Sequence, residues 1–153
     1  MAQAILGEHG VQVTRNPKGW EVGVHEVQLS PDFVSLFPSL KPTGKLSYQL
    51  LHADHVTCER ALPSTWLNIG SSASCKVQGL LEPGRVLTYQ GHPEFDRFLN
   101  AKSTAALGEL GYLPPEMLGD LLKLVDMDDD RVLAGEVAVE FFLSNQPIAD
   151  GVH

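Results

Sequence analysis

The sequence has little cysteine, few basic residues and no long hydrophobic run, and each shortage argues against a class of protein. Its only two cysteines, Cys58 and Cys75, form neither a disulfide framework nor a Cys-x-x-Cys metal site. The 11 Lys and Arg face 19 Asp and Glu, and a formal charge of −8 argues against a nucleic-acid partner, because such binders normally carry a basic stripe. No apolar run approaches the roughly 20 residues of a membrane span, and the first residues lack the basic start of a signal peptide. We therefore expect a cytoplasmic protein with no membrane partner.

The 153 residues, 43% of them hydrophobic, are typical of one globular domain that covers residues 1–153. The first part of the chain alternates apolar and polar residues and contains turn-forming pairs of Pro, Gly and Asn, which predicts short strands. The last part has helical spacing, interrupted at Pro114-Pro115. The order predicts an α/β or α+β fold. We expect strands at 11–14, 20–29, 46–51, 66–72, 76–80 and 86–89, helices at 2–6, 95–110, 116–125 and 132–143, and a short helix or a loop at 30–37.

Residues 86–95 (VLTYQGHPEF) are the most informative segment. An apolar run that is typical of a buried strand is followed by Gly91, and then by His92 and Glu94 on a turn stiffened by proline. An imidazole beside a carboxylate is two thirds of a nucleophilic triad, in which the carboxylate fixes the tautomer of the ring and the ring accepts the proton of the nucleophile. The alternative is a purely structural turn in which Glu94 caps or charges the start of the following helix.

Neither cysteine has the surroundings of a nucleophile. Cys75 lies in a turn with no glycine-flanked elbow before it and no helix after it, so we interpret it as a buried or half-buried core residue. Cys58 lies next to Glu59 and Arg60 in a loop, and we expect it to be inert.

Two other clusters could bind a metal ion. His52, Asp54 and His55 offer nitrogen and oxygen ligands, but residues three apart on a strand point to opposite faces, so that shared ligation would need a turn. The acidic run at 126–130 lacks the alternating ligands, central glycine and final glutamate of a calcium loop. We interpret this run as a solvated loop and helix start, and we predict neither a metal nor a cofactor.

Four segments, in order, resemble the class I glutamine amidotransferases of the triad type, which use Cys, His and Glu. Residues 16–23 (NPKGWEVG) resemble the segment after the nucleophile helix of that family, and residues 52–57 (HADHVT) resemble its H-x-D-x-V strand-to-loop segment. Residues 71–78 (SSASCKVQ) resemble its S-S-x-x-x-x-V-Q stretch. The most specific match is at residues 90–95 (QGHPEF). The resemblance implies the C-terminal portion of a flavodoxin-like domain, with a mixed sheet and flanking helices.

The resemblance implies that His92 is the general base and Glu94 its orienting carboxylate. In such enzymes a cysteine thiolate attacks the side-chain amide of glutamine, an oxyanion hole stabilises the intermediate, and a partner synthase uses the ammonia for small-molecule biosynthesis. The related γ-glutamyl peptidases cleave a similar bond. The family's nucleophile elbow, Gly-x-Cys-x-Gly, is absent from these residues, and we therefore expect a truncated domain with impaired activity.

Three alternatives stay open. The chain is an amidotransferase-like protein, a γ-glutamyl peptidase-like hydrolase completed by another chain, or an inactive interaction or regulatory remnant. A truncated sheet would expose a central strand and apolar surface, so we also expect a homodimer or poor solubility.

Overall fold

The computed structural model describes residues 2–144. Met1 and residues 145–153, which the predicted domain included, lie outside the described residues. The elements, in chain order, are α1 (Ala2–Leu6), a 3₁₀ turn (Gly7–His9), β1 (Val11–Arg15), β2 (Glu21–Leu29), α2 (Pro31–Leu36), a second 3₁₀ turn (Pro38–Leu40), β3 (Lys45–His52), β4 (Asp54–Cys58), β5 (Leu67–Asn68), β6 (Gly70–Ser71), β7 (Gly79–Glu82), β8 (Val86–Tyr89), α3 (Arg97–Glu109), α4 (Pro115–Val125) and α5 (Arg131–Leu143).

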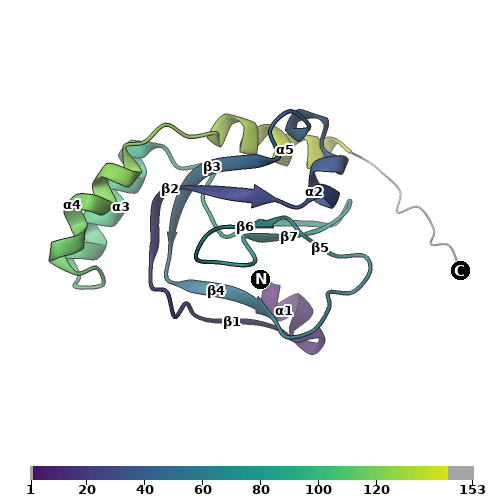
Figure 1. Ribbon diagram of the computed structural model, residues 1–153, viewed down its shortest axis with the longest axis horizontal. Helices are drawn as coiled ribbons and strands as arrows, with labels where there is room; N and C mark the ends of the chain where they lie inside the picture. The colour runs from purple at the N-terminus through teal and green to yellow at the C-terminus, as the bar shows by residue number, and fades with distance from the viewer. Residues whose placement is uncertain (1, 145–153) are drawn as a thin grey trace, which may run out of the picture.

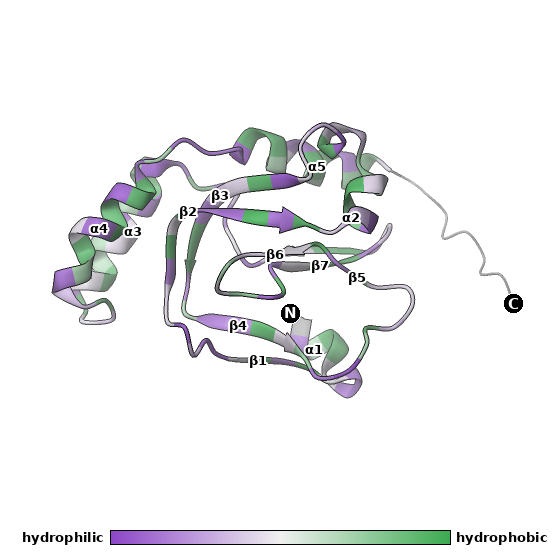
Figure 2. Ribbon diagram, viewed as in Figure 1, coloured by the Kyte–Doolittle hydropathy of each residue, from purple (hydrophilic) through white to green (hydrophobic). Residues whose placement is uncertain are grey.

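The centre of the molecule is the long antiparallel pair β2–β3, which Figure 1 shows bent through the middle of the view. Its register pairs Glu21 with His52 at one end and Gln28 with Lys45 at the other. The short strand β6 extends this sheet beside β2. Figure 2 shows hydrophobic and hydrophilic residues interleaved along β2 and β3, but burial alternates only toward the end of β2, and residues 21–24 and 48–50 are buried on both faces.

Two smaller antiparallel sheets complete the strand layer. β1 pairs with β4, and β7 lies between β5 and β8. The β7–β8 hairpin turns at Pro83-Gly84, where Gly84 has a φ of 71°, a left-handed conformation that favours glycine. The hairpin joins the regions where strands were expected at 76–80 and 86–89, and the chain continues from β8 to His92.

Helices cover the sheet on its outer sides. α5 lies along β3 at the top of Figure 1, and α3 and α4 form a hairpin at the left that packs on β2 and β3. α4 approaches β2 at Gly23, where a Cβ would lie 2.7 Å from the backbone of Leu124. The main apolar core forms between β2, β3, α2 and α5; it includes Val27, Phe33, Leu40, Leu46, Tyr48, Ile69 and Val137.

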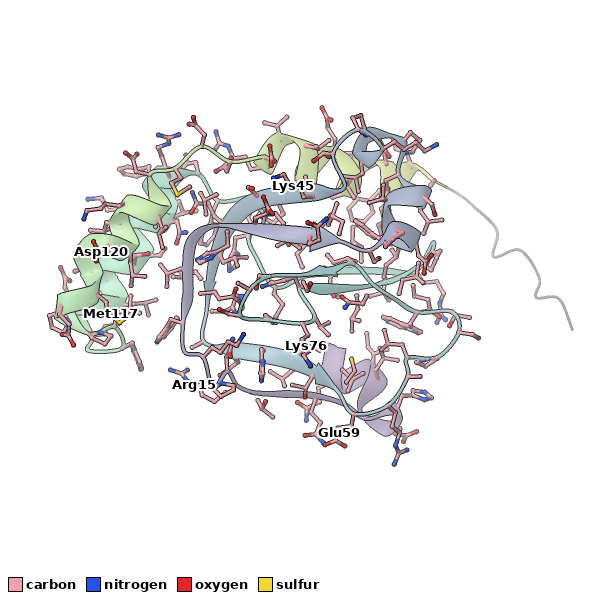
Figure 3. The ribbon with its side chains drawn as sticks, viewed as in Figure 1. Arg15, Lys45, Glu59, Lys76, Met117 and Asp120 are labelled. Atoms are coloured by element: carbon pink, nitrogen blue, oxygen red, sulfur yellow. The ribbon has the colours of Figure 1, made fainter. Side chains whose placement is uncertain are left out.

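Exposed ion pairs lie at the periphery. Lys45 pairs with Glu26 across β2 and β3, whereas Arg15 pairs with Asp54 across β1 and β4. Figure 3 places Lys45 at the top of the molecule and Arg15 near its lower left, so the two pairs belong to different regions of the surface. Exposed pairs of this kind contribute little to stability.

The expected α/β architecture of sheets with flanking helices is confirmed, and so are the helices at 2–6, 95–110, 116–125 and 132–143 to within two residues at either end. Of the two conformations expected at 30–37, the structure has the helix, α2. The strands expected at 66–72 and 76–80 were wrong in extent: the structure has two-residue strands at 67–68 and 70–71, and β7 begins only at Gly79. Within residues 2–144, no helix is long and apolar enough to span a membrane.

Candidate functional site

The His92 imidazole and the Glu94 carboxylate contact each other directly. Nδ1 of His92 lies 2.8 Å from Oε1 of Glu94, and 33% of the His92 side chain is exposed. Because a carboxylate accepts hydrogen bonds, Nδ1 is the protonated nitrogen of the neutral ring and Nε2 keeps its lone pair. The ring also stacks on Phe95 with a centroid distance of 4.1 Å. The geometry therefore presents an oriented, partly accessible base.

The backbone of the turn explains why the ring is placed here. The N–H of His92 donates to the carbonyl of Gln49 on β3 (2.8 Å), and the N–H of Phe95 donates back to the carbonyl of His92 (3.0 Å). Gly91 is buried against Tyr48 and Leu50 of β3 so closely that a Cβ would overlap both side chains. The chain can lie this close to β3 because residue 91 is glycine.

Gln49 joins the turn to the helical hairpin. Its side chain is fully buried, accepts from Nδ2 of Asn100 on α3 (2.6 Å) and donates to the carbonyl of Val125 at the end of α4 (3.0 Å). The same residue that holds His92 through its backbone thus holds α3 and α4 through its amide.

Glu94 does not cap the following helix. The side chain of Asp96 accepts from the N–H of Leu99 (2.7 Å) and is the N-cap of α3. Glu94, which is 64% exposed, bonds to His92 instead. Of the structural alternative, the cap by Glu94 is therefore wrong.

The segment His52–His55 differs from its expected conformation. The resemblance at 52–57 implies a strand that runs into a loop, but β3 continues to His52 and β4 starts at Asp54, with Ala53 alone between them. Nδ1 of His52 lies 2.8 Å from the carbonyl oxygen of Asp54, and the Asp54 carboxylate pairs with Arg15. Within residues 2–144, no group of three or more His, Cys, Asp or Glu side chains could hold a metal ion.

A buried polar network, which the sequence analysis missed, lies on the other side of His52. Glu21 is only 1% exposed; one of its carboxylate oxygens accepts from the Ser72 hydroxyl and the other from Nε2 of Gln78 (3.0 Å). The resemblance at 16–23 and 71–78 includes these residues, but it did not indicate that they meet.

One cysteine is buried between β6 and β7, and the other ends β4. Cys75 is buried, its thiol donates to the carbonyl of Val77 (3.2 Å), and its sulfur accepts from the Gln90 amide (3.4 Å). Cys58 does not lie in a loop as expected but ends β4, opposite Val11. Burial raises the pKa of both thiols. Neither cysteine of residues 2–144 hydrogen-bonds to His92, and the expectation that Cys75 is a core residue is confirmed.

The acidic run 126–130 is more structural than expected. Asp126 and Asp128 are exposed and pair with Arg97 at the start of α3 (3.2 and 2.9 Å). Asp130 accepts from the N–H of Ser47 on β3 (2.8 Å). The run therefore connects the α4–α5 segment to α3 by ion pairs and to β3 by a hydrogen bond.

Comparison with known proteins shows that the chain is similar to proteins named as glutamine amidotransferases. The chain is 38% identical to a Saccharomyces cerevisiae protein named a putative glutamine amidotransferase over 94 residues. The matched residues are 61% of this chain and 35% of that protein. A putative glutamine amidotransferase-like protein of Schizosaccharomyces pombe is 33% identical over 95 residues, again 61% of this chain and 35% of that protein. The match thus spans about a third of these relatives. No family model matches the chain.

Two solved structures share the fold. A glutamine amidotransferase from Thermotoga maritima superposes with a TM-score of 0.57 at 20% identity, over 94% of this chain and 60% of that one. A glutamine amido transferase from Methylobacillus flagellatus superposes with a TM-score of 0.58 at 16% identity, over 99% of this chain and 64% of that one. The chain therefore has homologues named as glutamine amidotransferases and shares the glutamine amidotransferase fold, which confirms the resemblance.

Proposed function

We propose that His92 and Glu94 are the general base and the orienting carboxylate of a site that releases ammonia from the side-chain amide of glutamine. The observation that carries this proposal is the 2.8 Å contact between Nδ1 of His92 and Oε1 of Glu94, on a turn held against β3. A base oriented by a carboxylate is what activation of a thiol requires.

In the proposed reaction, Nε2 of His92 accepts the proton of a cysteine thiol, and the thiolate attacks the amide carbon of glutamine. The C–N bond breaks, and the His92 imidazolium gives its proton to the departing ammonia. Water then attacks the thioester with His92 again as the base, which releases glutamate and regenerates the thiol. A γ-glutamyl compound would react in the same way, with its amine as the leaving group.

The placement of the thiols determines what this chain contributes. Cys75 bonds to Val77 and Gln90, and Cys58 lies at the end of β4, so the proposed nucleophile is neither of them. The proposal therefore places the thiol on residues outside these 153, and a synthase is the proposed consumer of ammonia. The same observation favours a second candidate, an inactive interaction or regulatory subunit, which needs no nucleophile.

A chimaera separates the two candidates. The chimaera consists of this chain joined to the part of the Thermotoga maritima glutamine amidotransferase on which it does not superpose. This chain thus replaces 60% of that protein. For a folded chimaera we expect glutamine-dependent ammonia release that falls roughly 10²–10⁴-fold in His92→Ala. Glu94→Gln should lower it as well, whereas Glu109→Gln, an exposed change at the end of α3, should leave it unchanged.

Release that persists in His92→Ala would refute the proposed role of this residue. A folded chimaera that releases no ammonia would favour the inactive subunit.

A further inference from the structure

A second histidine and carboxylate lie beside the first pair, but this carboxylate is buried. Glu21 begins β2 opposite His52, the last residue of β3, and it is 1% exposed. An ionisable side chain removed from water needs polar partners. Glu21 has two, the Ser72 hydroxyl and the Gln78 amide.

The His52 ring completes this arrangement. A carbonyl oxygen only accepts hydrogen bonds, so the 2.8 Å contact with the Asp54 carbonyl requires the proton on Nδ1 of His52. In the neutral ring Nε2 is then bare. This nitrogen is buried, has no hydrogen-bond partner and lies 3.5 Å from Oε2 of Glu21. A second proton on His52 would convert this contact into a buried ion pair.

Two sets of hydrogen bonds connect the Glu21 network to the His92–Glu94 turn. Ser72 accepts from the backbone N–H groups of Ser74 and Cys75 and so fixes the turn at 72–75. The carbonyl of Gln78 accepts from the N–H of Gln90, two residues before His92 (2.8 Å). On the other side, β3 carries both His52 and Gln49, whose carbonyl holds His92.

We infer that Glu21 is a positioning residue of the His92–Glu94 site: it holds segment 72–78 by hydrogen bonds, and its carboxylate lies against Nε2 of the His52 ring. The inference rests on the proposed function in that it takes the His92–Glu94 turn to be a reactive site. The contacts of Glu21, His52, Ser72 and Gln78 that carry it are independent of that function.

The surroundings of His52 shift the pKa of its ring in opposite directions. Burial lowers the pKa of the ring, and the nearby His25 and His92 lower it further. The Asp54 carbonyl and the Glu21 carboxylate raise it. Glu21 supplies the negative charge beside Nε2. Replacement of this carboxylate by a neutral amide should therefore reduce the proton affinity of His52 and of no other histidine. An amide N–H would also donate to the bare Nε2 and so favour the neutral ring.

The test is a pH titration of ¹⁵N-labelled histidine side chains by NMR, on the wild type, Glu21→Gln and Glu26→Gln. Glu26→Gln is the matched control, because Glu26 lies on the same strand but is exposed and pairs with Lys45. We expect the neutral His52 of the wild type to carry its proton on Nδ1. In Glu21→Gln the proton affinity of His52 should fall at least about tenfold, and the amides of Ser74 and Cys75 should exchange faster; the control should change neither.

A proton on Nε2 in the neutral wild-type ring would overturn the inference, and this result needs no variant to fold. An unchanged His52 affinity in folded Glu21→Gln would overturn it as well. Because the titration uses no glutamine, an inert chimaera would count against the proposed function and leave this result unaffected.

Discussion

The backbone N–H of His92 donates to the carbonyl of Gln49 across 2.8 Å, while the buried Gln49 side chain bonds to Asn100 and to the carbonyl of Val125. One residue of β3 therefore sets both the position of the turn that carries His92 and the docking of α3 and α4. The site and the helical hairpin depend on the same strand.

Replacement of Gln49 by Ala should destabilise the fold and loosen the helical hairpin. The change removes one of the two acceptors of the Asn100 amide, which keeps its bond to the Leu50 carbonyl, and the donor to the Val125 carbonyl. Each buried hydrogen-bonding group left unsatisfied costs about 1–3 kcal/mol. We expect the free energy of unfolding to fall by roughly 2–4 kcal/mol in urea titrations. Gln12→Ala, on the exposed β1, is the control. Equal stability of the two variants would contradict the role of Gln49.

Gly91→Ala should be destabilising because the added methyl group overlaps the ring of Tyr48 and the side chain of Leu50. Overpacking of this kind costs typically about 1–3 kcal/mol. Gly119→Ala on α4, where a Cβ meets nothing within 4 Å, should instead be neutral or stabilising by up to about 1 kcal/mol. Thermal unfolding measures both. A Gly91→Ala protein as stable as Gly119→Ala would show that the turn does not pack tightly on β3.

The titration of His52 should make the folded protein less stable in mild acid. Burial lowers the pKa of His52 from the ordinary value of 6.5, so that the unfolded chain binds this proton at a higher pH than the folded one. The free energy of unfolding should therefore decrease as the pH falls below about 6.5 and continue to decrease until the folded-state pKa is reached. His52→Asn should have a shallower pH dependence. Parallel curves for the two proteins would contradict this account.

Exposed apolar residues favour the expected self-association. Phe98 on α3 and Phe142 on α5 are 68% and 79% exposed. Exposed apolar surface promotes pairing or aggregation. We expect light scattering to show a dimer or larger species, and the change of both residues to Ser to shift it toward the monomer. A wild-type monomer at high protein concentration would be evidence against the expectation.

The parts of the fold that could be predicted from the sequence are those encoded locally. The spacing of Leu118, Leu121, Leu122 and Val125 predicts α4, and the turn residues Pro83-Gly84 predict the hairpin. His92 and Glu94 are two residues apart, so their contact could be inferred from the motif itself.

The buried network could not be predicted, because its partners are distant in sequence. Glu21 lies 51 residues from Ser72 and 57 from Gln78, and an alternating strand pattern does not reveal which polar residue is buried. Gly23 was an available signal, since a glycine within a strand often marks close backbone approach, here that of α4. The strands around Gly70 were misjudged because two-residue strands have no periodicity of their own.

The most direct measurement is the intact mass of the 153-residue chain and of the chimaera after treatment with an electrophilic glutamine analogue. We predict that the chain alone gains no adduct, because Cys75 bonds to Val77 and Gln90, Cys58 lies at the end of β4, and burial raises the pKa of both thiols. The chimaera should gain one adduct, on its added cysteine, at a rate that falls in His92→Ala. An adduct on Cys58 or Cys75 of the chain alone that disappears in His92→Ala would contradict the account.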